Sequence, residues 1–167
     1  MDSNNVGRTV SAVHVNLSPY PDLVPVSIEC SDTIYADTDV QLSWTIKNQG
    51  IGEAKAEWID QVMIHYDSTC TSSGSSQGKK THYSNLDTAT IYSDSLYISL
   101  DESWVGYKSI SVKTDNKNSV YEYNKEFNNK TGNDTLSPLC KMIFVTPDIN
   151  HPDLSVMSFS GTDTTYS

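Results

Sequence analysis

The sequence of 167 residues lacks the features that mark several large classes of protein. No apolar run approaches the about 18 residues that a transmembrane helix needs, so we expect no membrane span in this chain. Basic residues are scarce, because 11 Lys and Arg stand against 21 Asp and Glu and give a formal net charge of -10. Nucleic-acid binding requires a basic surface that displaces phosphate counterions, so this charge argues against a nucleic-acid partner.

The motifs of common catalytic sites are also missing. The sequence contains no HExxH zinc motif, no nucleophile elbow and no glycine-rich loop that would cradle a phosphate. Its four histidines do not pair at the spacing of metal ligands. We therefore expect a protein that is not an enzyme and that needs no cofactor, with calcium as one exception considered below.

Cysteine is rare, with only Cys30, Cys70 and Cys140, and none of them lies in a CxxC pair. On the strand order expected below, Cys30 and Cys70 follow strands that run in the same direction, whereas Cys140 opens a strand at the opposite end. We therefore expect a Cys30–Cys70 disulfide with Cys140 free if the protein passes through an oxidising compartment. Three unpaired cysteines are the alternative.

What the sequence does contain is apolar alternation with a period of two, the pattern of a half-buried strand. It is clearest in residues 39–48, where the apolar positions are Val40, Leu42, Trp44 and Ile46. We interpret Trp44 as the core tryptophan of a sandwich. Gly50 and Gly52 follow, and we expect them to supply the positive φ of a turn.

Similar patterns predict about seven strands in one unit. Their expected ranges are 23–29, 39–48, 57–66, 80–86, 90–100, 106–114 and 139–146. Residues 69–80, rich in Ser and Gly, show no periodicity and are expected to form a mobile surface loop. Short strands without any helical stripe indicate an all-β, immunoglobulin-like β-sandwich.

Asp60 interrupts the alternation on the inward side of its strand, between Trp58 and Val62. An unpaired charge is costly to bury, so this carboxylate needs partners such as a tyrosine hydroxyl, a lysine or a cation. We expect it to lie at the end of the sheet, partly solvated.

Two Pro-Asp-Leu triplets, at 21–23 and 152–154, indicate an internal repeat with the period of one domain. The alternating residues 13–17 likewise resemble 143–145. We therefore expect residues 1–20 to hold the last strand of a preceding repeat and a linker, 21–146 one complete repeat, and 147–167 a linker and the first strand of the next. Proline at each junction favours a stiff connection. The alternative is a chance likeness of the two triplets.

Several separated blocks resemble one known family. They are PDLV at 21–24, DV at 39–40, SWTIKNQG at 43–50, WIDQV at 58–62 and the Asp/Asn/Glu-rich stretch at 114–129. Together they resemble CARDB, the cell-adhesion-related domain found in bacteria, over about residues 21–145. The resemblance implies an immunoglobulin-like repeat of a large surface protein, located at the cell surface or secreted.

The stretch 115–129 is dense in oxygen ligands of the kind that calcium takes. The candidate ligands are Asp115, Asn118, Glu122, Asn124, Glu126 and Asn128. The spacing is not that of an EF-hand, because Lys117 stands where a ligand belongs and the turn glycine is missing. The alternative is that these side chains cap turns by bonding nearby backbone.

Aromatic residues near this stretch raise a second candidate site. Trp104 precedes a predicted strand, and Tyr121 and Tyr123 lie within the acidic stretch, so an exposed patch that binds a cell-surface glycan or protein is one interpretation.

The leading functional hypothesis is an extracellular spacer or fibre-forming repeat. Its partners would be the neighbouring repeats and, through head-to-tail β-augmentation, other copies of the protein. The alternative is a carbohydrate- or protein-binding module, with or without calcium, attached to a secreted protein.

Overall fold

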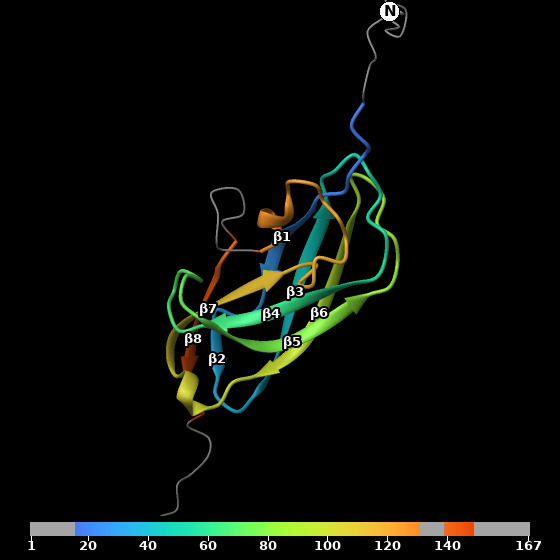
Figure 1. Ribbon diagram of the computed structural model, residues 1–167. Helices are drawn as coiled ribbons and strands as arrows, with labels where there is room; N and C mark the ends of the chain where they lie inside the picture. Colours follow the sequence, from blue (N-terminus) through green and yellow to red (C-terminus); the bar gives the residue numbers. More distant parts are fainter. Residues whose placement is uncertain (1–15, 131–138, 149–167) are drawn as a thin grey trace, which may run out of the picture.

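A computed structural model describes residues 16–130 and 139–148, which form two packed β-sheets (Figure 1). One sheet has the order β1-β3-β6 and the other β2-β8-β7-β4-β5. The strands are β1 Leu23–Glu29, β2 Thr33–Tyr35, β3 Asp39–Asn48, β4 Trp58–His65, β5 Gly74–His82, β6 Ile91–Ser99, β7 Gly106–Lys113 and β8 Lys141–Thr146. Two 3-10 turns, η1 Glu102–Trp104 and η2 Glu126–Asn128, complete the described elements. The expected all-β sandwich is confirmed.

The period-two pattern decides which side chains enter the core. In β3, Leu42, Trp44 and Ile46 are buried, while the residues between them stay at least partly exposed. Inward residues of β4 and β7, such as Val62 and Ile110, meet them from the other sheet and are also buried. Trp44 is only 1% exposed, so its interpretation as a core residue is confirmed.

The expectations for the fourth strand and the loop before it were wrong. The strand is β5, which begins at Gly74 within the supposed loop and pairs with β4 along its length. It lies at the edge of its sheet and has no fully buried residue, so it carries no apolar alternation. The three-residue β2, which pairs in parallel with β8, was also missed because it is too short to show a period.

The disulfide joins Cys70 to Cys140 and leaves Cys30 free, so the expected Cys30–Cys70 pairing was wrong. The strand directions were not the cause of the error. Ile110 of β7 pairs both with Ile64, near the end of β4, and with Lys141, the first residue of β8. This stagger places the start of β8 level with the end of β4.

The loop after β4 then brings Cys70 within reach of Cys140. Asp67 O accepts a hydrogen bond from the Ser109 hydroxyl of β7 at 2.7 Å. The Cys70 N–H donates to the same hydroxyl at 3.0 Å. The loop is therefore folded back over β7, where strand direction alone could not place it.

The Asp60 carboxylate connects the two sheets. Its Oδ2 accepts hydrogen bonds from Trp44 Nε1 of β3 at 2.8 Å and from the Tyr92 hydroxyl of β6 at 2.6 Å. Its Oδ1 accepts one from Thr114 Oγ1, just after β7, at 2.7 Å. The Tyr92 oxygen in turn accepts from Trp58 Nε1 at 3.0 Å.

This arrangement corrects the expectation that Asp60 is partly solvated. The residue is 2% exposed, and the expected tyrosine hydroxyl is among its partners. Burial raises the pKa of the Asp60 carboxyl, and the hydrogen bonds from Tyr92, Trp44 and Thr114 act in the opposite direction. The group is thus a satisfied acceptor between two layers rather than an open site.

We expect Asp60→Ala to lower the free energy of unfolding by about 3 kcal/mol, because it leaves buried donors of Trp44, Tyr92 and Thr114 without an acceptor. Denaturant titration measures the change. The matched control is Asp94→Ala, which removes an ion pair with Lys80 at 3.3 Å and a local bond from the next N–H, and should cost about 1 kcal/mol or less. Equal effects of the two substitutions would contradict the role of Asp60.

We expect peptide mapping without reduction to find Cys70 linked to Cys140, and Cys30 alkylated once the chain is denatured. The bridge spans 70 residues, so Cys140→Ser should lower the free energy of unfolding by about 4 kcal/mol through the entropy of the unfolded chain. Cys30→Ser serves as the control and should have a much smaller effect. A Cys30–Cys70 peptide would contradict this pairing.

Candidate functional site

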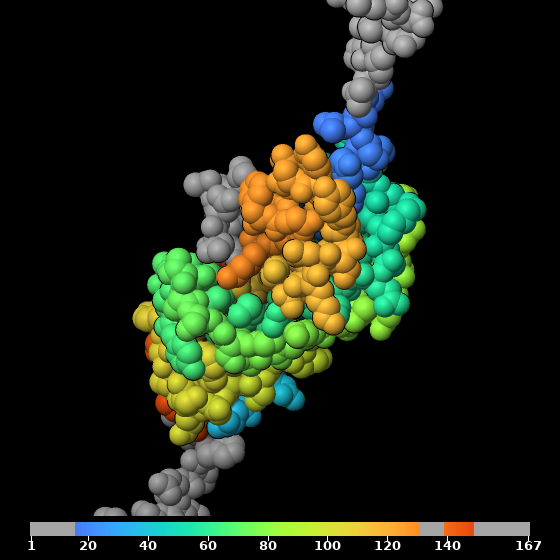
Figure 2. Space-filling view, viewed as in Figure 1, coloured from blue at the N-terminus to red at the C-terminus, as the bar shows by residue number. Residues whose placement is uncertain are grey.

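The acidic loop, residues 114–130, lies against the segment through which the chain enters the sandwich. Figure 2 shows the loop, in orange, beside the entry segment, in blue. Glu122 Oε1 accepts a hydrogen bond from the backbone N–H of Leu23 at 2.7 Å. Asn128 Nδ2 donates to Asp22 Oδ1 at 2.8 Å. Both contacts tie the loop to the start of β1.

The first part of the loop is a capped turn. Asp115 is fully buried, and its two carboxylate oxygens accept hydrogen bonds from the backbone N–H groups of Ser119 and Val120, both at 2.8 Å. Asn118 has a φ of 52°, a left-handed conformation that asparagine tolerates well. Of the six candidate calcium ligands, Asp115 is thus engaged with backbone, while Asn118 and Asn124 are exposed.

The second part brings Glu122, Glu126 and Asn128 close to Asp22 and Asn129. Glu126 Oε1 accepts from the Glu122 N–H at 3.0 Å, and its Oε2 accepts from Asn129 Nδ2 at 3.4 Å. Burial raises the pKa of the Glu122 carboxyl to about 8. The Leu23 N–H and Asn129 lower this pKa, whereas the charges of Glu126 and Asp22 raise it further.

Three oxygens of this part are buried without a hydrogen-bond donor: Glu122 Oε2, Asn128 Oδ1 and Asn129 Oδ1. Buried polar atoms are nearly always satisfied, so each of them needs an explanation. Carboxylate and amide oxygens are the donor types that a calcium ion takes, and in that respect the residues fit. Within residues 16–130 and 139–148, however, no three His, Cys, Asp or Glu side chains are grouped to hold a metal. Any such site would therefore depend on the amide oxygens.

The aromatic candidates separate into two places. Tyr123 stacks on Tyr20 with ring centroids 5.3 Å apart, and Tyr121 meets the same ring edge-on at 5.5 Å. Trp104 is buried instead and stacks on Tyr66 at 4.6 Å, so the structure does not bring it to Tyr121 and Tyr123.

Tyr20 was missed by the sequence analysis, although its position between two prolines, Pro19 and Pro21, was a signal that the segment is held in place. Beside it lies a groove of about 360 Å³, whose lining includes Leu17, Ile51 and Tyr123.

Comparison with known proteins identifies the fold. The profile of the CARDB family matches residues 20–133. The chain belongs to the CARDB family. No curated protein matches the sequence.

Two solved CARDB structures, both from Pyrococcus furiosus, resemble this CARDB domain. A crystal structure of a CARDB domain in complex with di-metal ions shares 18% identity at a TM-score of 0.58, and the match covers 80% of this chain and 100% of that one. A solution structure of a CARDB domain shares 18% identity at a TM-score of 0.53, covering 77% of this chain and 97% of that one. At this identity the likeness establishes the fold of the CARDB domain alone.

The buried Glu122 should make the stability of the domain depend on pH. Its pKa rises from an ordinary value of 4.5 to about 8 on folding, so the group favours the folded state below pH 4.5, and this contribution is lost as the pH rises through about 8. Glu122→Gln, which stays neutral, should therefore gain stability relative to the native protein between pH 5 and 9, by up to about 4 kcal/mol. Unfolding titrations across this range test the shift. The exposed Glu102→Gln is the control, and a pH-independent difference for Glu122→Gln would contradict the prediction.

Proposed function

We propose that this CARDB domain is a non-enzymatic extracellular repeat that acts as a spacer or fibre-forming unit of a larger surface protein. The observation that carries the proposal is the position of its ends. The described chain enters ahead of β1 at one end of the sandwich and leaves after β8 at the other (Figure 1). Consecutive units linked in this way would lie in line, which is the geometry of a rod.

Two further observations support the proposal. The Pro-Asp-Leu triplets at 21–23 and 152–154 recur at about the length of one such unit. The Cys70–Cys140 disulfide is typical of proteins that fold in an oxidising compartment, as surface and secreted proteins do.

The described residues contain no helix with the length and hydropathy needed to cross a bilayer.

Of the segment 13–17, expected to end a preceding repeat, only residues 16 and 17 are described, and neither lies in a strand. The expected first strand of the next repeat, 152–159, lies outside the described residues. Both assignments therefore remain predictions, as does head-to-tail pairing between molecules.

Electron microscopy of the intact protein tests the proposal. We expect elongated particles with an axial period of one sandwich, because each unit passes the chain from one end to the other. Particles without any axial period would contradict the spacer role.

A second function, cation binding by the acidic loop, is favoured by the three unpartnered oxygens of Glu122, Asn128 and Asn129. When bound there, calcium would supply positive charge to atoms that otherwise lack a donor. The side chains of Glu122 and Asn129 would hold it, and Glu126, whose Oε2 already accepts from Asn129, would orient the amide. The known CARDB domain with di-metal ions shows that this fold has accommodated metal in another chain.

We expect calcium in the millimolar range to raise the melting temperature of the domain, since binding to the folded state alone stabilises it in proportion to the logarithm of the ligand concentration. Calorimetric titration measures the affinity directly. Asn129→Ala should abolish the effect, whereas Asn118→Ala, at an exposed position of the same loop, should leave it intact. An unchanged melting temperature at saturating calcium would exclude this function. Glycan binding through Tyr121 and Tyr123 remains a prediction.

A further inference from the structure

The entry segment, residues 19–22, is bonded to the body of the domain rather than free. The carbonyl oxygen of Tyr20 accepts hydrogen bonds from the N–H groups of Ile51 and Gly52, at 3.1 and 3.0 Å. The N–H of Gln49 donates to Asp22 O at 2.7 Å. These contacts fix the position of the segment on the domain.

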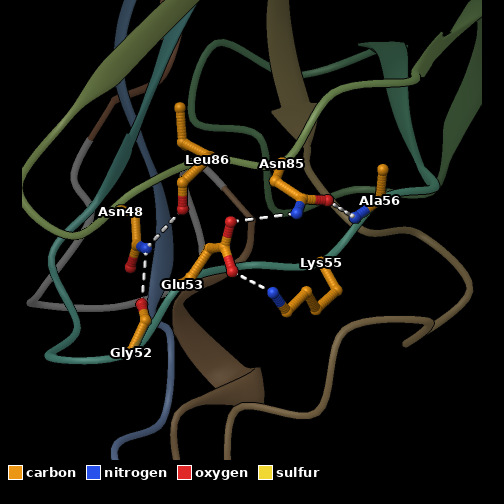
Figure 3. Close-up of polar contacts among 7 residues, drawn as sticks. All are labelled: Asn48, Gly52, Glu53, Lys55, Ala56, Asn85 and Leu86. Atoms are coloured by element: carbon orange, nitrogen blue, oxygen red, sulfur yellow. Dashed lines mark hydrogen bonds and ion pairs between the residues drawn. The ribbon is translucent and has the colours of Figure 1, made fainter.

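The turn that holds the entry segment is itself fixed by Asn48, which is fully buried at the end of β3. Its Oδ1 accepts from the Asp22 N–H at 3.0 Å. Its Nδ2 donates to Gly52 O at 2.8 Å and to Leu86 O at 3.0 Å, as Figure 3 shows. In the same view Asn85 bonds Glu53 and the Ala56 backbone, so the 48–56 turn is tied to the 85–86 segment. One side chain thus joins the entry segment to two loops.

Gly50 and Gly52 allow the entry segment to lie this close. Neither has a positive φ, so the expectation that they supply a left-handed turn was wrong. A Cβ at Gly50 would lie 2.4 Å from Tyr20 O, and one at Gly52 would lie 2.4 Å from Pro19 O. The glycines are needed here for backbone approach.

The acidic loop holds the same segment from the other side. Besides the bonds to Asp22 and Leu23 described above, the ring of Tyr20 contacts both Tyr121 and Tyr123. Tyr123 adopts a φ of 60°, a left-handed conformation that is unfavourable for a bulky residue and that its contacts must offset. The stacking of the Tyr123 ring on Tyr20 is one of these contacts.

The surface around the entry segment is apolar and open. Leu17 and Ile51 are 70% and 77% exposed, and Tyr121 and Tyr123 are 64% and 48% exposed. They surround or adjoin the groove of about 360 Å³. An exposed apolar cluster in so acidic a chain indicates a surface that another body covers.

We propose that residues 19–22 attach the preceding repeat rigidly to this domain. The end of that repeat then packs against the groove beside Tyr20, Ile51 and Tyr123. The proposal rests on the tandem arrangement proposed above. Residues 16 and 17 lie in no strand, so seven residues, 16–22, separate the rest of the expected strand 13–17 from β1. With 19–22 fixed, only the three residues 16–18 are free, and they span at most about 11 Å. A domain attached at that distance must lie against this end of the sandwich. The junction between repeats is then stiff and has one orientation.

Hydroxyl-radical footprinting of the intact protein tests whether the preceding repeat packs against the groove. We expect Tyr121, which is 64% exposed in the described domain, to be modified clearly more slowly than Tyr97, which is 68% exposed on β6, does not line the groove and serves as the internal control. Rates for Tyr121 and Tyr123 that match Tyr97 would overturn the proposal. Protection that develops only when a saccharide is added would also overturn it, in favour of glycan binding.

Hydrogen exchange tests whether the entry segment is rigidly attached to the domain. The amides of Ile51 and Gly52 should be protected in the intact protein, and Gly52→Ala should speed the exchange of Ile51 about tenfold or more by displacing residue 19. Gly78→Ala is the matched control, because its Cβ would lie 2.8 Å from Leu96 Cδ2, the movable end of a side chain. An unchanged exchange rate of the Ile51 amide in Gly52→Ala would overturn the proposed rigid attachment.

The two proposals fail in different ways. Particles with an axial period, in which Tyr121 and Tyr123 react with hydroxyl radical as fast as Tyr97, would be consistent with the spacer function. They would overturn the packing of the preceding repeat against the groove. Particles without an axial period would overturn the spacer function. They would also overturn the packing of the preceding repeat against the groove, whatever the reactivity of the tyrosines.

Discussion

The hydrogen bonds to the buried Asp60 carboxylate are the constraint on which the rest of the structure depends. Apolar packing alone would let two sheets slide, since dispersion and burial have little directional preference. Asp60 fixes their relative position, because its donors come from β3 and β6 in one sheet and from the end of β7 in the other. The Thr114 hydroxyl is the donor to Oδ1, and Oδ2 has two donors from the other sheet, so a shift of one sheet against the other would break these bonds and leave buried polar groups without partners.

The same principle extends from the core to the ends of the domain. Asn48, like Asp60, is a buried polar side chain with several partners. It bonds backbone groups of Asp22, Gly52 and Leu86, and so connects the core strand β3 to the entry segment. The acidic loop adds Glu122 and Asn128 on the other side of that segment. Polar residues that resemble a ligand-binding site are therefore used largely to position the chain, and this is the property that a spacer requires.

Sequence predicted the fold where the chain alternates and failed where other forces decide. The strands 39–48 and 23–29 were predicted at their observed bounds. In 39–48 one face is buried, whereas in 23–29 the buried residues are the consecutive Leu23, Val24 and Pro25. The edge strand β5 is held by backbone bonds to β4 and carries no apolar signal. The disulfide pairing depends on the stagger of β8 against β7 and on the folded-back 66–73 loop. Neither can be predicted from the order and direction of the strands.

The candidate site was predicted in part. Composition identified the acidic stretch and Tyr121 and Tyr123, since dense Asp, Asn and Glu are visible in sequence. It could not show that Asp115 caps its own turn, that Trp104 packs against Tyr66, or that Tyr20 completes the aromatic cluster. These facts depend on contacts between residues far apart in the chain.

Native-state hydrogen exchange at increasing denaturant concentration tests the central claim, that Asp60 joins the sheets into one mechanical unit. The amides of β3 and β7, which lie in different sheets, should exchange through the same global opening with equal free energies and equal denaturant dependence. If β3 and β7 open separately, with different free energies, then the two sheets are not coupled and Asp60 does not hold them together.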